Sequence, residues 1–202
     1  MLDRVAYYLA LVTLVTVPAT LIAWLLLHPF VSFWRRLGSG KALIVIIVAT
    51  VLAMLVMYLV REPLLRLRFG VRWPLVGASA ILLALSSYLN ALVYREAPKS
   101  MALGLAEISS DDPGQLVTRG VYSHLRHPRF VAMALAVAAM ALLTNFAAVY
   151  ILFVVYVVAI FVIALLEERE LVSRFGSRYV EYANDVPRFL PRISGHRQSG
   201  CV

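Results

Sequence analysis

Long apolar runs alternate with short polar segments along this chain. A run of about 20 predominantly apolar residues is long enough to cross a bilayer as a helix. Three such runs occupy residues 5–27, 42–60 and 73–94. Pro18 falls inside the first run and predicts a kink, which neighbouring helices can accommodate. The pattern therefore predicts three membrane-spanning helices in the first half of the chain.

The second half contains a longer apolar run over residues 131–166, interrupted by Thr144 and Asn145. A helix over residues 129–143 would be short for a full span, whereas residues 146–166 are long enough. We expect these two helices to form a hairpin with a tight turn at the membrane edge.

A tail with helical periodicity follows the hairpin. Apolar residues recur at roughly helical spacing from Leu166 to Tyr182, which predicts that the last span continues as an amphipathic helix along the membrane surface. The prolines at 187 and 191 predict its end.

The chain thus divides at about residue 94. Residues 1–94 hold the first three spans, and residues 95–202 hold a polar connector, the hairpin over 129–166 and the tail over 167–192.

Composition agrees with this membrane architecture. Hydrophobic residues make up 62% of the chain and charged residues 15%, against roughly 45–50% and about 25% in soluble domains. The net charge of +8 lies in short segments between apolar runs, as in loops that face anionic lipid headgroups. We expect an all-α integral membrane protein of about five spans, in contact with membrane lipids and not with nucleic acid.

The distribution of basic residues predicts an orientation. With five spans, the loops at 28–41 and 95–129 and the C-terminal tail share one side and hold 14 of the 19 Lys and Arg residues. The positive-inside rule then places the N-terminus outside and the C-terminus in the cytoplasm. The absence of a signal-peptide pattern predicts that the first apolar run is a span.

Several common sites are excluded by their residue patterns. The lone Cys201 excludes an intramolecular disulfide or a multi-thiolate metal site within one chain. The Gly-Ser-Gly-Lys stretch at 38–41 has Arg35 where a phosphate-binding loop needs glycine. His124 and His127 lie among arginines that would repel a cation, so we predict no metal site.

Two polar motifs flank the hairpin. Arg126, His127 and Pro128 precede its first helix, and Glu167 and Glu168 follow its second. The hairpin brings both motifs to the same membrane face, where basic groups and carboxylates together would suit a zwitterionic ligand. S-adenosylmethionine is one such ligand, although the geometry does not by itself name it.

At these residues the chain resembles the isoprenylcysteine carboxyl methyltransferase family of membrane methyltransferases, which is related to phospholipid N-methyltransferases. The resemblance covers about residues 116–192. Its motifs, in order, are Gly120-Val121-Tyr122, Arg126-His127-Pro128-Arg129-Phe130, Glu167-Glu168, the stretch from Phe175-Gly176 to Tyr179 and Tyr182, and Val186-Pro187 with Pro191.

The resemblance implies an S-adenosylmethionine-dependent methyltransferase that releases S-adenosylhomocysteine. Its cofactor pocket would lie at the cytosolic face, with a lateral opening for a lipophilic small-molecule or lipid acceptor. In this resemblance the pocket would be shaped by Tyr122, Arg126, His127 and Pro128. Glu167 and Glu168 would hold the cofactor's polar groups, and Tyr179 and Tyr182 would form a wall of the pocket. Arg188 would bind the cofactor's carboxylate.

The chain departs from the family pattern at two places. Phe130 replaces a tyrosine, and residues 161–166 lack the arginine that orients the substrate carboxylate in the prenylcysteine enzymes. The second departure argues against a prenylcysteine acceptor and leaves carboxyl O-methylation and amine N-methylation open. No catalytic base is assigned by the sequence.

Two other functions remain open at this point. His124 and His127 would suit a non-enzymatic protein that binds haem or lipid on the same scaffold. A nicotinamide-dependent membrane reductase would share a broadly similar C-terminal half.

Overall fold

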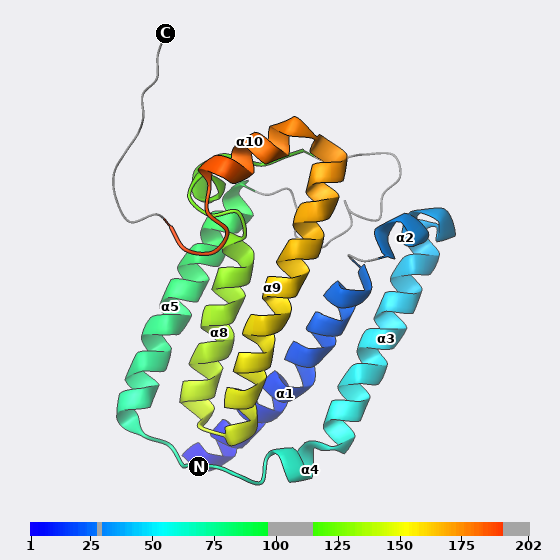
Figure 1. Cartoon of the computed structure of the whole chain (residues 1–202). Helices are drawn as coiled ribbons and strands as arrows, with labels where there is room; N and C mark the ends of the chain where they lie inside the picture. Colours follow the sequence, from blue (N-terminus) through cyan, green and yellow to red (C-terminus); the bar gives the residue numbers. More distant parts are fainter. Residues whose placement is uncertain (28–29, 97–114, 192–202) are drawn as a thin grey trace.

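The computed structural model describes residues 1–27, 30–96 and 115–191, and within these ranges it contains helices and no strand (Figure 1). Five long helices form a bundle. They are α1 (Leu2–Leu27), α3 (Ser39–Leu59), α5 (Trp73–Glu96), α8 (Pro128–Thr144) and α9 (Ala147–Phe175). Shorter helices connect or cover them, namely α2 (Val31–Leu37), α4 (Arg61–Leu64), η2 (Gly120–Ser123) and α10 (Ser177–Asp185). Most of the polar connector lies outside the described residues.

Four of the long helices, α1, α3, α5 and α9, are long and apolar enough to cross a membrane. The fifth, α8, has 17 residues and is about 26 Å long, somewhat less than the roughly 30 Å of a bilayer's hydrocarbon core. It runs beside α9 through the bundle (Figure 1). The expectation of an all-α integral membrane protein is confirmed, with four full-length candidate spans and one shorter helix.

The helix α8 lies inside the bundle and packs against α1, α5 and α9. Its contact with α5 includes a buried hydrogen bond from the Ser86 hydroxyl to the Ala132 carbonyl, at 2.7 Å. Val137 of α8 packs with Leu21 of α1 and Tyr156 of α9 in one apolar cluster. In contrast, α3 packs on α1 and turns most of its side chains outward, as expected where lipid covers the surface.

Asn145 forms the turn between α8 and α9, and this confirms the tight turn predicted there. Its backbone is left-handed, with φ 54°. Its side-chain amide donates to the Gly70 carbonyl at 2.7 Å, and its Oδ1 accepts a hydrogen bond from the Tyr150 hydroxyl at 3.0 Å. The Phe69 amide donates to the Asn145 carbonyl at 3.0 Å, so the loop before α5 is fastened to the hairpin.

The tail differs from the predicted single amphipathic helix. Helix α9 continues to Phe175, so that Glu167 and Glu168 lie inside it rather than at its end. The chain then turns at Gly176, whose φ of 57° and ψ of −135° are accessible to glycine and strained for other residues. The following helix, α10, crosses the end of the bundle and ends before Val186, as the prolines predicted (Figure 1).

Candidate functional site

Three segments meet at the α10 end of the bundle, namely residues 120–127, the last turns of α9, and residues 186–190, which we call the tail strap. The backbone amide of Arg126 donates to the Pro187 carbonyl at 2.9 Å, and that of His127 donates to the Arg188 carbonyl at 3.1 Å. These two bonds hold the tail strap against the start of the hairpin.

Glu168 lies at the centre of this junction and is buried. Arg188 donates to both of its carboxylate oxygens, from Nε at 2.8 Å and from Nη2 at 2.7 Å. Arg126 Nη1 lies 3.1 Å from Glu168 Oε1, and His127 Nε2 lies 3.0 Å from the same oxygen. The sequence motifs on either side of the hairpin therefore do meet in space.

His127 links the two glutamates. It occupies the N-cap position of α8 without a side-chain capping hydrogen bond, and it precedes Pro128, which is fully buried at the first helical position, where proline is favoured. Its Nδ1 lies 3.5 Å from Glu167 Oε2. Burial alone would lower the pKa of His127, but hydrogen bonds to Glu167 and Glu168 outweigh burial and raise it.

We call Arg126, His127, Glu167, Glu168 and Arg188 the charged cluster. With His127 protonated, it holds three positive and two negative groups, which leaves an excess of one positive charge. Buried ionic groups are costly unless they are paired, so this arrangement requires each partner to stay in place. The excess charge favours an anionic group as an additional partner.

The tyrosines of the site act as neutral side chains. Burial raises the pKa of both Tyr122 and Tyr179 to about 12, and it also raises that of Tyr182. The Tyr182 hydroxyl donates to the Tyr122 carbonyl at 2.6 Å, and the rings of Tyr179 and Tyr182 meet edge to face at 5.9 Å. These contacts fix α10 over the segment that precedes α8, and a role for the phenols as bases is disfavoured.

His124 lies apart from the charged cluster. Its side chain is exposed, and its Nδ1 contacts the Ser123 hydroxyl at 3.0 Å. Within the described residues, no group of three His, Cys, Asp or Glu side chains is placed to hold a metal ion.

Two aromatic residues of the site were not foreseen from the sequence. The ring of Phe189, in the tail strap, lies 5.7 Å from the His127 ring and 6.2 Å from that of Phe161. The Arg188 guanidinium lies 5.7 Å from the centroid of the Phe161 ring. The signal available in the sequence was an aromatic residue next to Arg188, between the two prolines of the tail.

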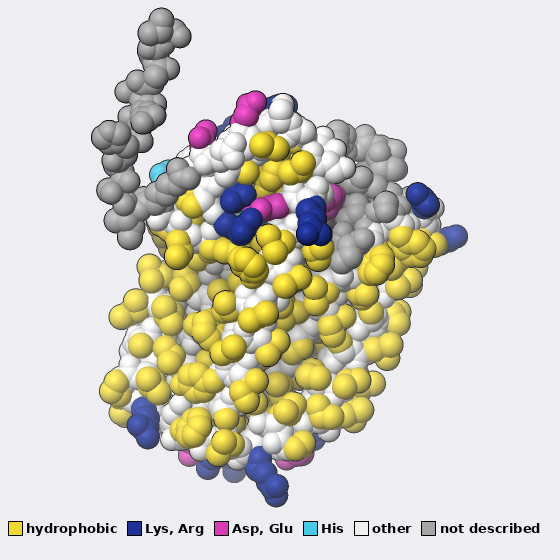
Figure 2. All heavy atoms as spheres, in the orientation of Figure 1, with side chains coloured by type: hydrophobic (Ala, Val, Ile, Leu, Met, Phe, Trp, Pro, Cys, Tyr) yellow, Lys and Arg dark blue, Asp and Glu magenta, His cyan; other side chains and the backbone are white. Residues whose placement is uncertain are grey.

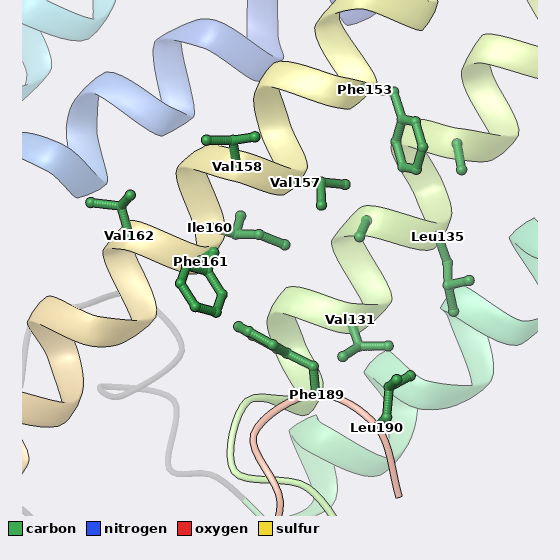
Figure 3. Close-up of a pocket in the computed structure, with 12 residues that line it drawn as sticks. Val131, Leu135, Phe153, Val157, Val158, Ile160, Phe161, Val162, Phe189 and Leu190 are labelled. Carbon is green, nitrogen blue, oxygen red and sulfur yellow. The ribbon is translucent and has the colours of Figure 1, made fainter.

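An apolar groove of about 510 Å³ begins at the tail strap and continues between α8 and α9 (Figure 3). Its lining side chains are all apolar. They are Val131, Ala134, Leu135, Ala138, Phe153, Val157, Val158, Ile160, Phe161, Val162, Phe189 and Leu190. Figure 2 shows charged side chains gathered at this end of the molecule, above a broad hydrophobic surface. The groove thus leads from the apolar belt toward the charged cluster.

The groups present fit S-adenosylmethionine, which carries a carboxylate, an ammonium and ribose hydroxyls. Arg126 Nε and the Tyr179 hydroxyl are buried and have no hydrogen-bond partner among the residues described, so both can donate to a ligand. Glu167 and Glu168 supply acceptor oxygens beside them. The donor and acceptor set therefore matches the polar groups of this cofactor.

Comparison with known families matches residues 75–178 to the phospholipid methyltransferase family model. The matched segment includes α8, α9 and all but the first two residues of α5. It carries both motifs that flank the hairpin, whereas the tail strap lies beyond it. No curated protein and no solved structure matches the chain.

Proposed function

Because this chain belongs to the phospholipid methyltransferase family, we propose that it uses S-adenosylmethionine to methylate a lipophilic or membrane-embedded acceptor. The observation that carries the proposal is the charged cluster together with Tyr179, beside an apolar groove. Arg126 Nε and the Tyr179 hydroxyl are buried donors without a hydrogen-bond partner among the described residues, and Glu167 and Glu168 supply acceptor carboxylates. We further propose that this end of the bundle faces the cytoplasm, as the distribution of Lys and Arg predicts.

The cofactor would supply a methyl group on a sulfonium, which is the electrophile of the reaction. The chain's own task is then to bind, align and dehydrate the reactants. In this proposal Arg126 and Arg188 receive the carboxylate of the cofactor, and Glu167 and Glu168 accept from its ammonium and hydroxyl groups. Pro128 and the rings of Tyr122, Tyr179 and Tyr182 wall the pocket.

The acceptor would place its apolar chain in the groove between α8 and α9, where no polar side chain would be left unsatisfied. A carboxylate acceptor attacks the methyl group without a base. An ammonium acceptor must first transfer a proton, which Glu167, or His127 in its neutral form, would accept. Carboxyl O-methylation and amine N-methylation therefore differ in their dependence on these two side chains.

Calorimetry with S-adenosylhomocysteine tests cofactor use directly. The purified, folded protein should bind it with a measurable heat, and an absence of binding would contradict the proposal. A methyl-transfer assay with labelled cofactor should then find activity in a panel of prenylcysteine, phosphatidylethanolamine, thiol and isoprenoid-acid acceptors.

A further inference from the structure

The ring of Phe189 stands between the apolar groove and the charged cluster. We propose that Phe189, together with Phe161, forms the aperture through which the acceptor's head group reaches the cluster, and that it selects acceptors by head-group size. This proposal makes Phe189 a specificity-determining residue. It rests on the proposed function, because the groove is taken as the acceptor site.

The contacts of Phe189 support this position. On one side its ring lies against the imidazole of His127, which is 5% exposed and belongs to the charged cluster. On the other side it lines the groove and meets Phe161 of α9 (Figure 3). In this proposal, a head group that reaches His127 from the groove passes beside these two rings.

The backbone of the tail strap keeps Phe189 in this place. The Arg188 carbonyl accepts from the His127 amide, and the Arg188 side chain holds Glu168 through two hydrogen bonds. The neighbouring side chains thus face different parts of the site, with Arg188 on the carboxylate and Phe189 on the groove. Because the two residues before Phe189 are held by backbone hydrogen bonds, its ring is positioned more firmly than a side chain on a loose loop.

The aperture also explains how a polar site can adjoin a lipid-facing groove. The ring of Phe130 also stacks on the His127 imidazole, at 5.4 Å and 12°. Contact with two phenyl rings keeps the imidazole away from water, which strengthens its interactions with the glutamates. A small head group can pass beside one ring, whereas a bulky one requires the ring to be removed.

Photocrosslinking tests the aperture without knowledge of the natural acceptor. Two probes would share one long alkyl chain with a diazirine close to the head, and would carry either a hydroxyl or a phosphocholine head. In the wild type, the hydroxyl probe should label the peptide that contains residues 126–130, and the phosphocholine probe should label it far less. In Phe189→Ala the ratio of phosphocholine to hydroxyl labelling should rise by about tenfold, which corresponds to ~1.4 kcal/mol.

Three further variants separate selection from structural support. Phe189→Tyr should keep the wild-type ratio, and Phe189→Leu should give an intermediate one. Leu190→Ala is the matched control, because Leu190 lines the same groove and is 78% exposed. It should leave the ratio unchanged.

An unchanged labelling ratio in both Phe189→Ala and Phe189→Leu would overturn the proposal. So would a rise of equal size in Leu190→Ala. S-adenosylhomocysteine binding is measured in parallel and should change less than about twofold in Phe189→Leu. If the wild type itself does not bind S-adenosylhomocysteine, the proposed function fails, while the labelling ratio still decides whether the aperture exists.

Discussion

Glu168 is the side chain on which the charged cluster depends. Three basic groups share its carboxylate, and each reaches it from a different place in the chain, namely the connector for Arg126, the start of α8 for His127, and the tail strap for Arg188. Removal of the carboxylate would leave these groups close together without their counter-charge. We therefore expect Glu168 to bear on both folding and ligand binding.

We predict that Glu168→Gln lowers both stability and cofactor affinity. Removing one partner of a buried ionic network costs about 3–5 kcal/mol, and the amide keeps the shape without the charge. The melting temperature in detergent should fall, and S-adenosylhomocysteine should bind at least about tenfold more weakly, or ~1.4 kcal/mol. Glu170→Gln is the matched control, since Glu170 lies on the same helix and pairs with Arg174 at 3.3 Å. Equal affinities for the two variants would argue against a role for Glu168 in binding.

We also predict that His127 makes stability depend on pH. Its pKa is raised in the folded protein above the unfolded value of about 6.5, so the folded state holds the proton more tightly. The resulting stabilisation is fully present below about pH 6.5 and is lost as the pH rises through the folded pKa. The melting temperature of the wild type should therefore fall over that range. His127→Gln should show a flatter profile there, and identical profiles would contradict the assignment.

At the residue scale, the pairing of His127 with Glu168 could be predicted, because a helical hairpin returns its two ends to one face. The neighbours of the cluster could not all be predicted. The positions of Phe189 and of Tyr182, whose hydroxyl reaches the Tyr122 carbonyl, depend on how the tail folds back over the bundle. The spacing of apolar residues along the tail does not predict how it folds back.

At the element scale, the turn at Asn145 fixes the register of α8 against α9. A left-handed backbone is open to asparagine and glycine at modest cost and is unfavourable for alanine by roughly 1–2 kcal/mol. The side-chain amide also satisfies the Gly70 carbonyl and the Tyr150 hydroxyl. The turn therefore combines a backbone preference with a link to the loop before α5.

Two substitutions should separate these contributions. We predict that Asn145→Gly loses the side-chain hydrogen bonds but keeps the turn, at a cost of about 1–3 kcal/mol. Asn145→Ala should be less stable than Asn145→Gly by the cost of the left-handed backbone conformation for alanine. A comparison of unfolding midpoints in mild detergent would measure this difference. If the alanine variant is the more stable one, the left-handed conformation does not constrain the turn.

The helices themselves were largely predictable because membrane spans are read from length and apolarity. The ends of α5 and the brevity of α8 agree with expectation, since charged residues and prolines mark them. The corner at Gly176 was missed because one glycine does not interrupt an apolar periodicity. Its backbone angles, not the spacing of its neighbours, separate α9 from α10.

At the scale of the whole molecule, the N-terminus and α10 lie at opposite ends of the bundle (Figure 1), and the charged cluster lies at the α10 end. The odd number of predicted spans placed the N-terminus and the tail on opposite sides of the membrane, and the separation of the N-terminus from α10 agrees with that arrangement. The end of the bundle that faces the cytoplasm is measured with the protein in its membrane.

Cysteine labelling in cells would measure that orientation. In a Cys201→Ser background, we predict that Leu2→Cys reacts with a membrane-impermeant maleimide in intact cells. Ser177→Cys, at the start of α10, should react only after permeabilisation. Both positions are exposed, so accessibility is limited by the membrane and not by burial. The reverse pattern would place the site outside.

The tail strap has a consequence for biosynthesis. All five long helices are complete by Phe175, but the Arg188 guanidinium that pairs with Glu168 comes thirteen residues later. A chain cut short by a premature stop codon between these points would still contain every membrane helix and would lack the strap's arginine and phenylalanine. We therefore expect insertion of the helices into the bilayer to precede completion of the proposed pocket, which needs the residues translated after Phe175.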